Sequence, residues 1–256
     1  MSREVSSPAL VLRTRPYGES DRLVTLLTED HGKLTGIAKG AKNSKRRFAG
    51  TLEPFLQIRA VYQMRPSSDL VFLHRCELLR PFRRFTRDLD CWAAGSYVLD
   101  LTDRIVLGRE SGHEVYGLVL SALALLDAGT APGAVLQVLE LRLLAASGYE
   151  AGLAACQSCG RDLAGVATVY LISHRGGFLC RPCVPPGEVV RPVSGATARE
   201  LDRLASEPLE RAVELASPSD EAKAVVEALL TNATTGPVRS RAFLGLSRVD
   251  SPGVLR

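Results

Sequence analysis

The stretch GKLTGIAKGAKNSKRRFAG, residues 32–50, carries six cationic side chains and no acidic one. Its first half has the glycine-punctuated apolar pattern of a strand, whereas its second half has no apolar periodicity and indicates a loop. The sequence therefore predicts a cluster of cations on a strand end and on the loop that follows it. A run of charge is equally typical of a solvated loop. The six cations are Lys33, Lys39, Lys42, Lys45, Arg46 and Arg47.

The positive charge of the chain is concentrated around this stretch. Residues 1–87 contain 17 Lys and Arg against 8 Asp and Glu, a net charge of +9, whereas the other 169 residues carry −5 and the whole chain carries +4. A segregated positive field attracts phosphate polymers and speeds their capture. We therefore expect a nucleic acid as the ligand of the N-terminal third.

Short β-like runs surround the basic stretch, at residues 8–15, 22–28, 33–40, 55–63 and 70–78. Turn residues separate these runs. Short strands of this number suit a small closed barrel such as an OB-fold, which presents one face and its loops to oligonucleotides. An SH3-like barrel has a similar number of strands and stays open as an alternative. The aromatic residues of this region offer base-stacking faces, although an aromatic residue in a barrel strand is more often part of the core. They are Tyr17, Phe48, Phe55, Tyr62 and Phe72.

Beyond residue 80 the apolar period changes to three and four, which predicts helices. One apolar helical face comprises Leu89, Trp92, Ala93, Tyr97, Val98, Leu101 and Ile105. Further helices are expected at residues 114–128 and 133–147. Later in the chain, Thr197-x-x-Glu200 has the pattern of a capping box that opens a short helix, and Ser217-Pro218 opens another.

The expected fold class is α+β with several domains. We assign residues 1–80 to an OB-fold β-barrel, 81–150 and 193–247 to the two parts of a helical bundle, 151–192 to an inserted four-cysteine zinc finger, and 248–256 to a tail. With 256 residues and 46% hydrophobic side chains, the chain can bury a sizeable core. The N-terminus lacks the apolar region of a signal peptide, and the longest uncharged apolar runs are about half the ~20 residues of a membrane span. We therefore expect a cytoplasmic protein without membrane contact.

Four cysteines form two C-x2-C pairs, Cys156 with Cys159 and Cys180 with Cys183, separated by twenty residues. This is the spacing of a structural tetrathiolate zinc site, and a hairpin around His174 would bring the pairs together. Redox chemistry is the alternative, but it requires only one such pair. Four thiolates fill the tetrahedral shell of Zn²⁺, so we expect one structural Zn²⁺ that leaves no position for water.

No residue pattern points to catalysis. The four histidines are scattered, and none lies in an HExxH, HxE or GxSxG frame. The phosphate-binding pattern GxxxxGK[ST] is missing as well. We therefore expect a protein that is not an enzyme. A zinc hydrolase or deaminase would need a site with fewer than four sulfur ligands and a bound water.

Motifs from nearly the whole chain combine into one further pattern. They are Tyr17-x-Glu19-x-x-x-Leu23-Val24-Thr25-Leu26, then Gly32-x-Leu34 with Ala38-Lys39-Gly40-Ala41, Leu52-x-Pro54-Phe55, the four-cysteine insert, and Arg239-Ser-Arg241-x-Phe243-Leu244. Together these motifs resemble the RecO family of bacterial DNA repair and recombination mediators. The resemblance implies an N-terminal OB-fold, a helical domain and, as in many members, a zinc-binding insert.

The resemblance also implies a function. Proteins of this family bind single- and double-stranded DNA and anneal complementary strands. They also engage the single-stranded-DNA-binding protein and its acidic C-terminal tail, and they join RecR to help load RecA in the RecFOR pathway. We therefore expect a cytoplasmic protein that associates with the nucleoid. The resemblance places the DNA surface at the basic stretch and carries over Lys39 through the AKGA match, whereas Lys45, Arg46 and Arg47 rest on charge alone. A zinc-containing RNA- or ribosome-binding module stays open, because only the 2′-hydroxyl separates the two substrates.

Overall fold

A computed structural model of the chain describes residues 3–64, 70–108, 112–148, 153–173, 176–217 and 219–245. These residues have the expected α+β fold, with eight strands and six α-helices. The chain divides into two compact units, Met1–Pro132 with Val238–Arg256, and Gly133–Pro237. The domain boundaries assigned from the sequence stay a prediction.

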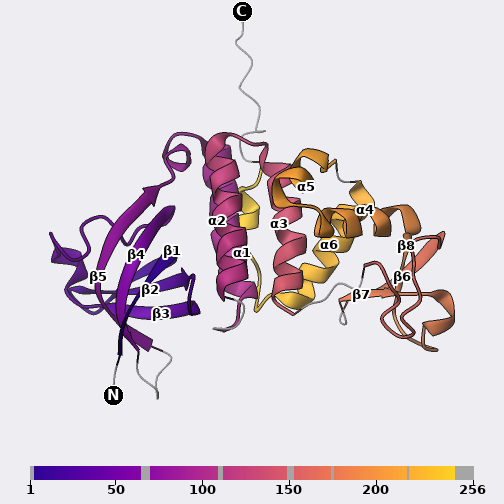
Figure 1. Cartoon of the computed structure of the whole chain (residues 1–256), viewed down its shortest axis with the longest axis horizontal. Helices are drawn as coiled ribbons and strands as arrows, with labels where there is room; N and C mark the ends of the chain where they lie inside the picture. The colour runs from indigo at the N-terminus through magenta and orange to yellow at the C-terminus, as the bar shows by residue number, and fades with distance from the viewer. Residues whose placement is uncertain are drawn as a thin grey trace, which may run out of the picture. The chain divides into compact units, whose positions relative to one another are not determined.

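The first unit begins with a closed five-stranded barrel of strand order β1-β2-β3-β5-β4 (Figure 1). The long strand β1 pairs antiparallel with both β2 and β4, and β3 runs parallel to β5, so the barrel has the predicted OB-like form. Strand β1 begins five residues before the predicted start, because four of these five residues, Arg3, Glu4, Ser6 and Ser7, are polar and conceal any apolar alternation. The strands are β1 (Arg3–Tyr17), β2 (Asp21–Thr28), β3 (Gly32–Ala38), β4 (Leu56–Met64) and β5 (Leu70–Pro81).

The barrel interior is filled by alternate strand residues, among them Val24, Leu26 and Ile58, each fully buried. Phe48 and Leu52, from the loop between β3 and β4, join this core with 3% and 2% of their surface exposed. Of the aromatic residues considered for base stacking, Phe48 and Tyr62 are therefore core residues. Burial of Phe48 also anchors the loop that carries the cations.

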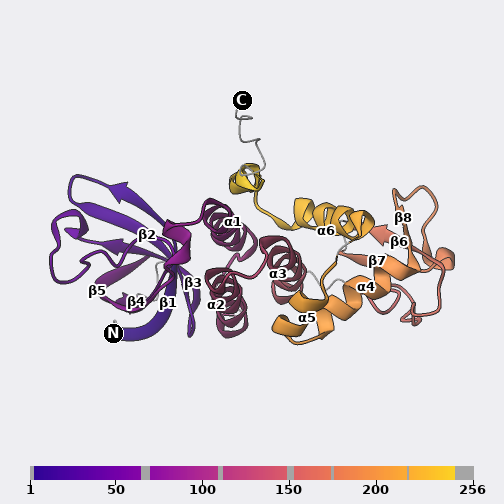
Figure 2. The same cartoon turned by 90° about the horizontal axis from the view of Figure 1, so that it is seen from above.

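Helices α1 (Leu89–Ile105) and α2 (Gly112–Ala128) run side by side in the first unit (Figure 2). The side chain of Asp88 caps α1 by accepting a hydrogen bond from the Cys91 amide at 3.0 Å. The predicted apolar face of α1 is correct except at its start, where Leu89 and Trp92 are 56% and 37% exposed. Trp92 departs from the predicted face because its ring packs against Phe243 of the short 3-10 helix η5 (Arg239–Phe243). The helical period does not encode this contact.

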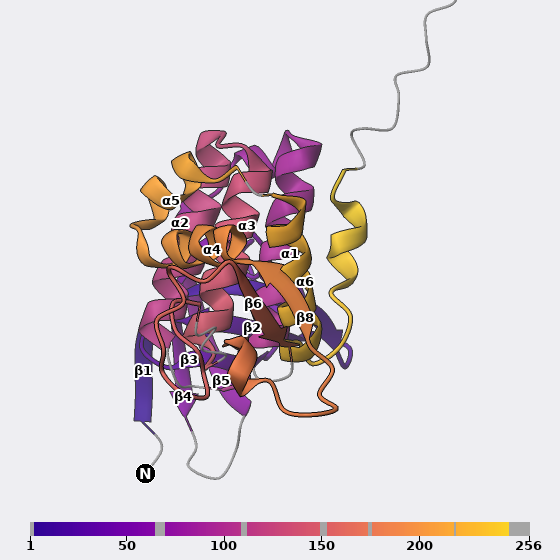
Figure 3. The ribbon, with the colours of Figure 1, turned by 90° about the vertical axis from the view of Figure 1, so that its right-hand side faces the viewer.

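The second unit combines four helices with a small sheet of order β7-β6-β8 (Figure 1), of which β6 and β8 are also labelled in Figure 3. The strands are β6 (Thr168–Ile172), β7 (Gly177–Leu179) and β8 (Arg191–Ser194), and the helices are α3 (Pro132–Ala146), α4 (Gly195–Ser206), α5 (Leu209–Leu215) and α6 (Asp220–Ala233). No helix within the described residues has the length and hydropathy that a bilayer crossing requires.

Two helix starts in this unit differ from the prediction. Helix α4 is capped by Ser194 and not by Thr197, because the Thr197 hydroxyl donates to the Glu221 carboxylate of α6 at 2.5 Å. Helix α6 is capped by Ser219, whose side chain accepts from the Ala222 amide, and the predicted start at Pro218 lies outside the described residues. The correction at α4 comes from a tertiary contact, whereas the cap of α6 is local.

Candidate metal centre and nucleic-acid interface

The first cysteine pair lies on a tight turn closed by main-chain hydrogen bonds. The Gly160 amide donates to the Cys156 carbonyl at 2.8 Å, and the Cys156 amide donates to the Arg161 carbonyl at 2.8 Å. Gly160 has φ +70°, a left-handed conformation that glycine adopts without steric cost. The turn therefore brings Cys156 and Cys159 to the same side of the backbone.

The second pair follows the hairpin of β6 and β7, in which Tyr170 faces Leu179 across the strands. Cys183 ends a 3-10 helix and donates from its amide to the Cys180 carbonyl at 3.0 Å. A hydrogen bond of 3.0 Å from the Gln157 amide to the Phe178 carbonyl joins the first turn to β7. The predicted hairpin is confirmed, although its turn residues, His174 and Arg175, lie outside the described residues.

The four predicted ligands are brought together. The sulfur atoms of Cys156, Cys159, Cys180 and Cys183 all lie within 4.8 Å of one another, and those of Cys159 and Cys180 are 3.8 Å apart. A tetrahedral site with Zn–S bonds of about 2.3 Å has sulfur atoms separated by about 3.8 Å. The four thiols are therefore placed to hold one metal ion.

The Cys156 sulfur lies in a setting that favours the thiolate. Burial acts to raise its pKa, but the main-chain N–H groups of Cys180, Cys159 and Ser158 outweigh burial and lower the pKa to about 6. The Cys180 amide is 3.4 Å from this sulfur. Metal ligation requires deprotonated cysteine, and the main-chain N–H groups favour this form at Cys156, whereas burial raises the pKa of Cys180 to about 12.

The cysteines outside the two pairs have a different role. Cys76 and Cys91 are buried, and burial raises the pKa of the first to about 12 and that of the second to about 11. Both therefore stay neutral thiols that fill core space.

Five of the six predicted DNA-binding cations lie on one loop, which we call the basic loop (residues 39–47). It leaves β3 through Gly40, which has φ +64° and donates from its amide to the Asp21 carboxylate at 2.8 Å. This amide is the main cause of the lowered pKa of Asp21, to which Lys39 and Lys42 also contribute. The loop ends where the Ser44 hydroxyl accepts from the amides of Arg47 and Phe48, at 3.1 and 3.2 Å. Main-chain contacts thus fix both ends.

The cations of the basic loop are exposed, and the heads of three of them contact neutral groups. The Lys42 ammonium donates to the carbonyls of Gly18 and Glu19, at 3.0 and 2.7 Å. Arg47 donates to the Lys39 carbonyl at 2.7 Å and lies over the Phe48 ring, and the Lys39 ammonium lies 5.4 Å from the centre of the Phe72 ring.

Lys45 and Arg46 form neither a hydrogen bond nor an ion pair through their side chains in the part of the chain that the structure describes. Within that part, no carboxylate lies within ion-pair distance of any of the five cations. A phosphate that approaches the basic loop therefore meets cations that no close ion pair within the described residues occupies.

Lys33 lies apart from this group. Its side chain is only 19% exposed, and its ammonium lies 2.5 Å from the Asp103 carbonyl and 3.5 Å from the Asp103 carboxylate, which also pairs with Arg13 at 2.8 Å. Burial lowers the pKa of Lys33. These contacts tie the barrel to α1, and sequence reasoning missed them because Asp103 is 70 residues away along the chain.

Comparison with known proteins agrees with the geometry. The family models "Recombination protein O N terminal" and "Recombination protein O C terminal" match residues 1–82 and 86–242. The chain is 38% identical to DNA repair protein RecO of Anaeromyxobacter sp. (strain Fw109-5) over 247 residues, which cover 95% of this chain and 96% of the relative.

Two further relatives bear the same name. DNA repair protein RecO of Myxococcus xanthus is 40% identical over 175 residues, which cover 68% of this chain and 70% of the relative. That of Geobacter sulfurreducens is 34% identical over 237 residues, which cover 92% and 95%.

Proposed function

Because the chain belongs to the RecO family of DNA repair proteins, we propose that it is a recombination mediator that binds single- and double-stranded DNA and anneals complementary strands. The observation that carries this proposal is the basic loop, which holds five exposed cations on an OB-like barrel without a carboxylate partner among the described residues. OB-folds commonly bind oligonucleotides through a face and its loops. The binding is expected to show little sequence preference, since cations of this kind contact phosphate and not base edges.

The mechanism requires no catalytic step. Each cation that contacts a phosphate releases condensed counterions, which supplies the binding free energy and makes it dependent on salt. A protein that neutralises two strands at once lowers their mutual repulsion, and base pairing then drives annealing. The hydrogen bonds of the Gly40 amide and the Ser44 hydroxyl hold the backbone of the basic loop in place, so that little loop entropy is lost on binding.

The partners follow from the family. We propose that the chain acts in the cytoplasm at the nucleoid and accepts strands coated by single-stranded-DNA-binding protein through that protein's acidic C-terminal tail. We further propose that it joins RecR to help load RecA.

We propose Zn²⁺ as the ion held by Cys156, Cys159, Cys180 and Cys183. The donor set supports this choice, since four thiolates at tetrahedral spacing are typical of structural zinc. The bound ion would join the two cysteine turns, and it would stabilise a small hydrophobic core that includes Leu163, Val169 and Phe178.

The proposed DNA surface is tested by annealing complementary strands coated with single-strand-binding protein, without ATP. The loop variant replaces Lys39, Lys45 and Arg46 with Glu, because none of these three side chains donates a hydrogen bond within the described residues. The control variant replaces Arg203, Arg211 and Lys223, exposed in the second unit, with Glu and so changes the net charge equally. We expect the natural chain and the control variant to anneal DNA and the loop variant to fail.

Two results would contradict the proposal. One is annealing by the loop variant at the rate of the natural chain. The other is binding of RNA in clear preference to DNA of the same sequence, which would favour an RNA-binding module.

A further inference from the structure

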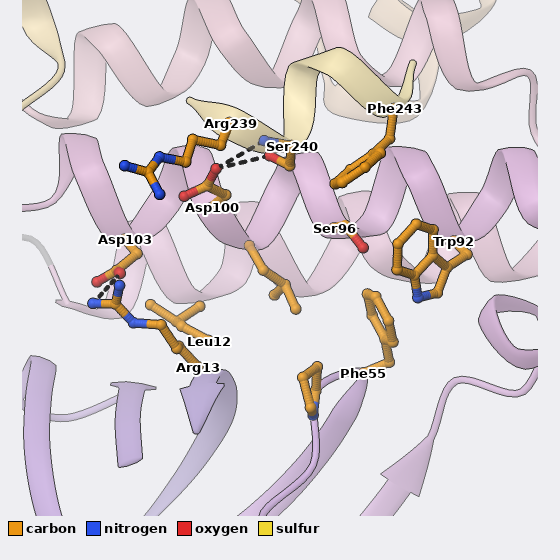
Figure 4. Close-up of a pocket in the computed structure, with 12 residues that line it drawn as sticks. Leu12, Arg13, Phe55, Trp92, Ser96, Asp100, Asp103, Arg239, Ser240 and Phe243 are labelled. Carbon is orange, nitrogen blue, oxygen red and sulfur yellow. Dashed lines mark hydrogen bonds and ion pairs between the residues drawn. The ribbon is translucent and has the colours of Figure 1, made fainter. Parts of the chain in front are cut away.

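A cavity of about 360 Å³ lies beside α1 in the first unit (Figure 4). Residues of β1, of the segment before β4, of α1 and of η5 line it. Aromatic rings lie at one end, where Phe55, Trp92 and Phe243 gather, and charged groups lie at the other (Figure 4). The metal centre and the basic loop do not contribute to this cavity.

The aromatic end is open to solvent. Trp92 and Phe243 are 37% and 39% exposed, their ring centres are 5.6 Å apart and their planes are inclined by 53°. Large exposed aromatic rings beside a cavity are unusual on a surface that binds nothing. This end of the cavity therefore offers flat apolar faces to a ligand.

The third aromatic residue, Phe55, is held in a strained backbone conformation. Its φ of +62° is left-handed, and it is the only residue other than glycine with positive φ in the described part of the chain. The Phe55 ring stacks on Phe85 with 4.5 Å between the ring centres, and this stack fits against α1 because Gly95 has no side chain there. Such strain commonly persists where a site depends on it.

The charged end carries one positive charge without a partner. Its two carboxylates are satisfied, since Asp103 pairs with Arg13 at 2.8 Å and Asp100 accepts from the Ser240 hydroxyl at 2.9 Å and from Arg104 at 2.8 Å. The remaining charged residue of the lining, Arg239, is exposed and has no ion-pair partner among the described residues. The charge left for a ligand is therefore positive.

We propose that this cavity binds one unstacked nucleobase of single-stranded DNA, with the base stacked on Phe243 beside Trp92 and its phosphate next to Arg239. The proposal rests on the proposed function. Aromatic side chains accept any base because every base has a π face, and a phosphate complements the free cation at the other end. The segment that begins with the basic loop also ends at this cavity, at Pro54 and Phe55, so that one stretch of chain carries both contacts.

Trp92 provides the assay, since it is the only tryptophan of the chain. The probes are an oligothymidylate and an abasic sugar-phosphate oligomer of the same length, each titrated into the full chain at several salt concentrations. We expect the oligothymidylate to quench the emission of Trp92 and the abasic oligomer to leave it nearly unchanged.

The variants separate the contribution of the base to the binding affinity from that of the phosphate. Phe243→Ala should bind the oligothymidylate about tenfold more weakly and bind the abasic oligomer as the natural chain does. Arg239→Ala should weaken the binding of both oligomers and reduce the salt slope by about 0.7, the value of one phosphate contact on a single strand. Phe243→Leu keeps an apolar side chain for packing but removes the π face, so it should match Phe243→Ala. The matched control is Leu107→Ala, which shortens an exposed apolar side chain outside the cavity.

The experiment distinguishes a failure of the nucleobase site from a failure of the proposed function. Oligothymidylate binding with unchanged Trp92 emission and natural affinity in both Phe243 variants would overturn the nucleobase site and leave the proposed function standing. Failure of the natural chain to bind either oligomer at low salt would overturn both. A change of Trp92 emission with an acidic apolar peptide and not with the oligothymidylate would also overturn the nucleobase site, and would assign the cavity to a protein partner.

Discussion

Replacing Gly95 with Ala tests how tightly the aromatic wall is packed. Gly95 is buried in the middle of α1, and an added Cβ would lie 2.6 Å from Cδ1 of Phe85 and 2.8 Å from Cε1 of Phe55. Carbon atoms in contact prefer a separation of about 3.5–4.0 Å, so the stacked pair must move by roughly 1 Å. Phe85 is 2% exposed and also packs edge-on against Phe82, which leaves it little room.

Two effects oppose each other in this variant. Alanine is favoured over glycine inside a helix by about 1 kcal/mol, whereas overpacking a core costs about 1–3 kcal/mol. Because the displaced rings are buried or strained, we expect the cost to exceed the gain and the free energy of unfolding to fall by up to about 2 kcal/mol. The matched control is Gly117→Ala, in the middle of α2, where the added Cβ meets no atom within 4 Å.

The two substitutions should therefore change the free energy of unfolding in opposite directions. Urea unfolding followed by Trp92 fluorescence should show Gly95→Ala less stable than the natural chain and Gly117→Ala more stable by up to about 1 kcal/mol. Both glycines belong to the first unit, so one transition reports on both. A Gly95→Ala protein as stable as the Gly117→Ala protein would refute the tight packing of Phe55 and Phe85 on α1.

Three further predictions concern other parts of the chain. Chelation of the metal, or Cys159→Ser, should release about one equivalent of zinc and lower the melting temperature by at least about 5 °C; an unchanged melting curve would exclude a structural metal. Gly195→Ala should destabilise the second unit by about 3 kcal/mol in urea unfolding, because a Cβ there would overlap the Val166 carbonyl oxygen. A variant as stable as the natural chain would show that the backbone at Val166 can move aside. Burial acts to raise the pKa of Asp100, but hydrogen bonds from Ser240 and the nearby Arg104 outweigh it, so the pKa lies below 3.8. The stabilisation that Asp100 gives is therefore complete above pH 3.8 and is lost as the pH falls through the lowered pKa, so Trp92 emission should change in acid and Asp100→Asn should remove that change; a transition that persists in the variant would exclude this carboxylate.

The strands and the metal ligands could be predicted from the sequence because each depends on short-range order. Apolar alternation marks β2 to β5 directly, and a tetrathiolate requires its cysteines in closely spaced pairs. The start of β1 was missed because four of its first five residues are polar, and they become strand only through pairing with β4. Helix α5 was missed because seven residues are too few to show a helical period.

Contacts between residues far apart in the sequence account for the features that were not predicted. The pattern at Thr197 satisfies the rule for a cap, but Glu221 from another helix binds its hydroxyl and moves the cap to Ser194. Lys33 has the charge of a DNA contact, yet a carboxylate far along the chain binds it. The left-handed backbone of Phe55 depends on Phe85 and has no signal in local sequence, where glycine is the residue expected at positive φ.

The most direct test of the basic loop is the salt dependence of its affinity for a labelled single-stranded oligonucleotide. If all five loop cations contact phosphates, the logarithm of the binding constant should fall with a slope of about −3.5 against the logarithm of salt concentration, or about 100-fold between 50 and 200 mM. The loop variant retains two of these cations and should show a slope no steeper than about −1.4, a loss of about sevenfold, whereas the control variant should match the natural chain. Equal slopes for the natural chain and the loop variant would show that the DNA phosphates are bound elsewhere.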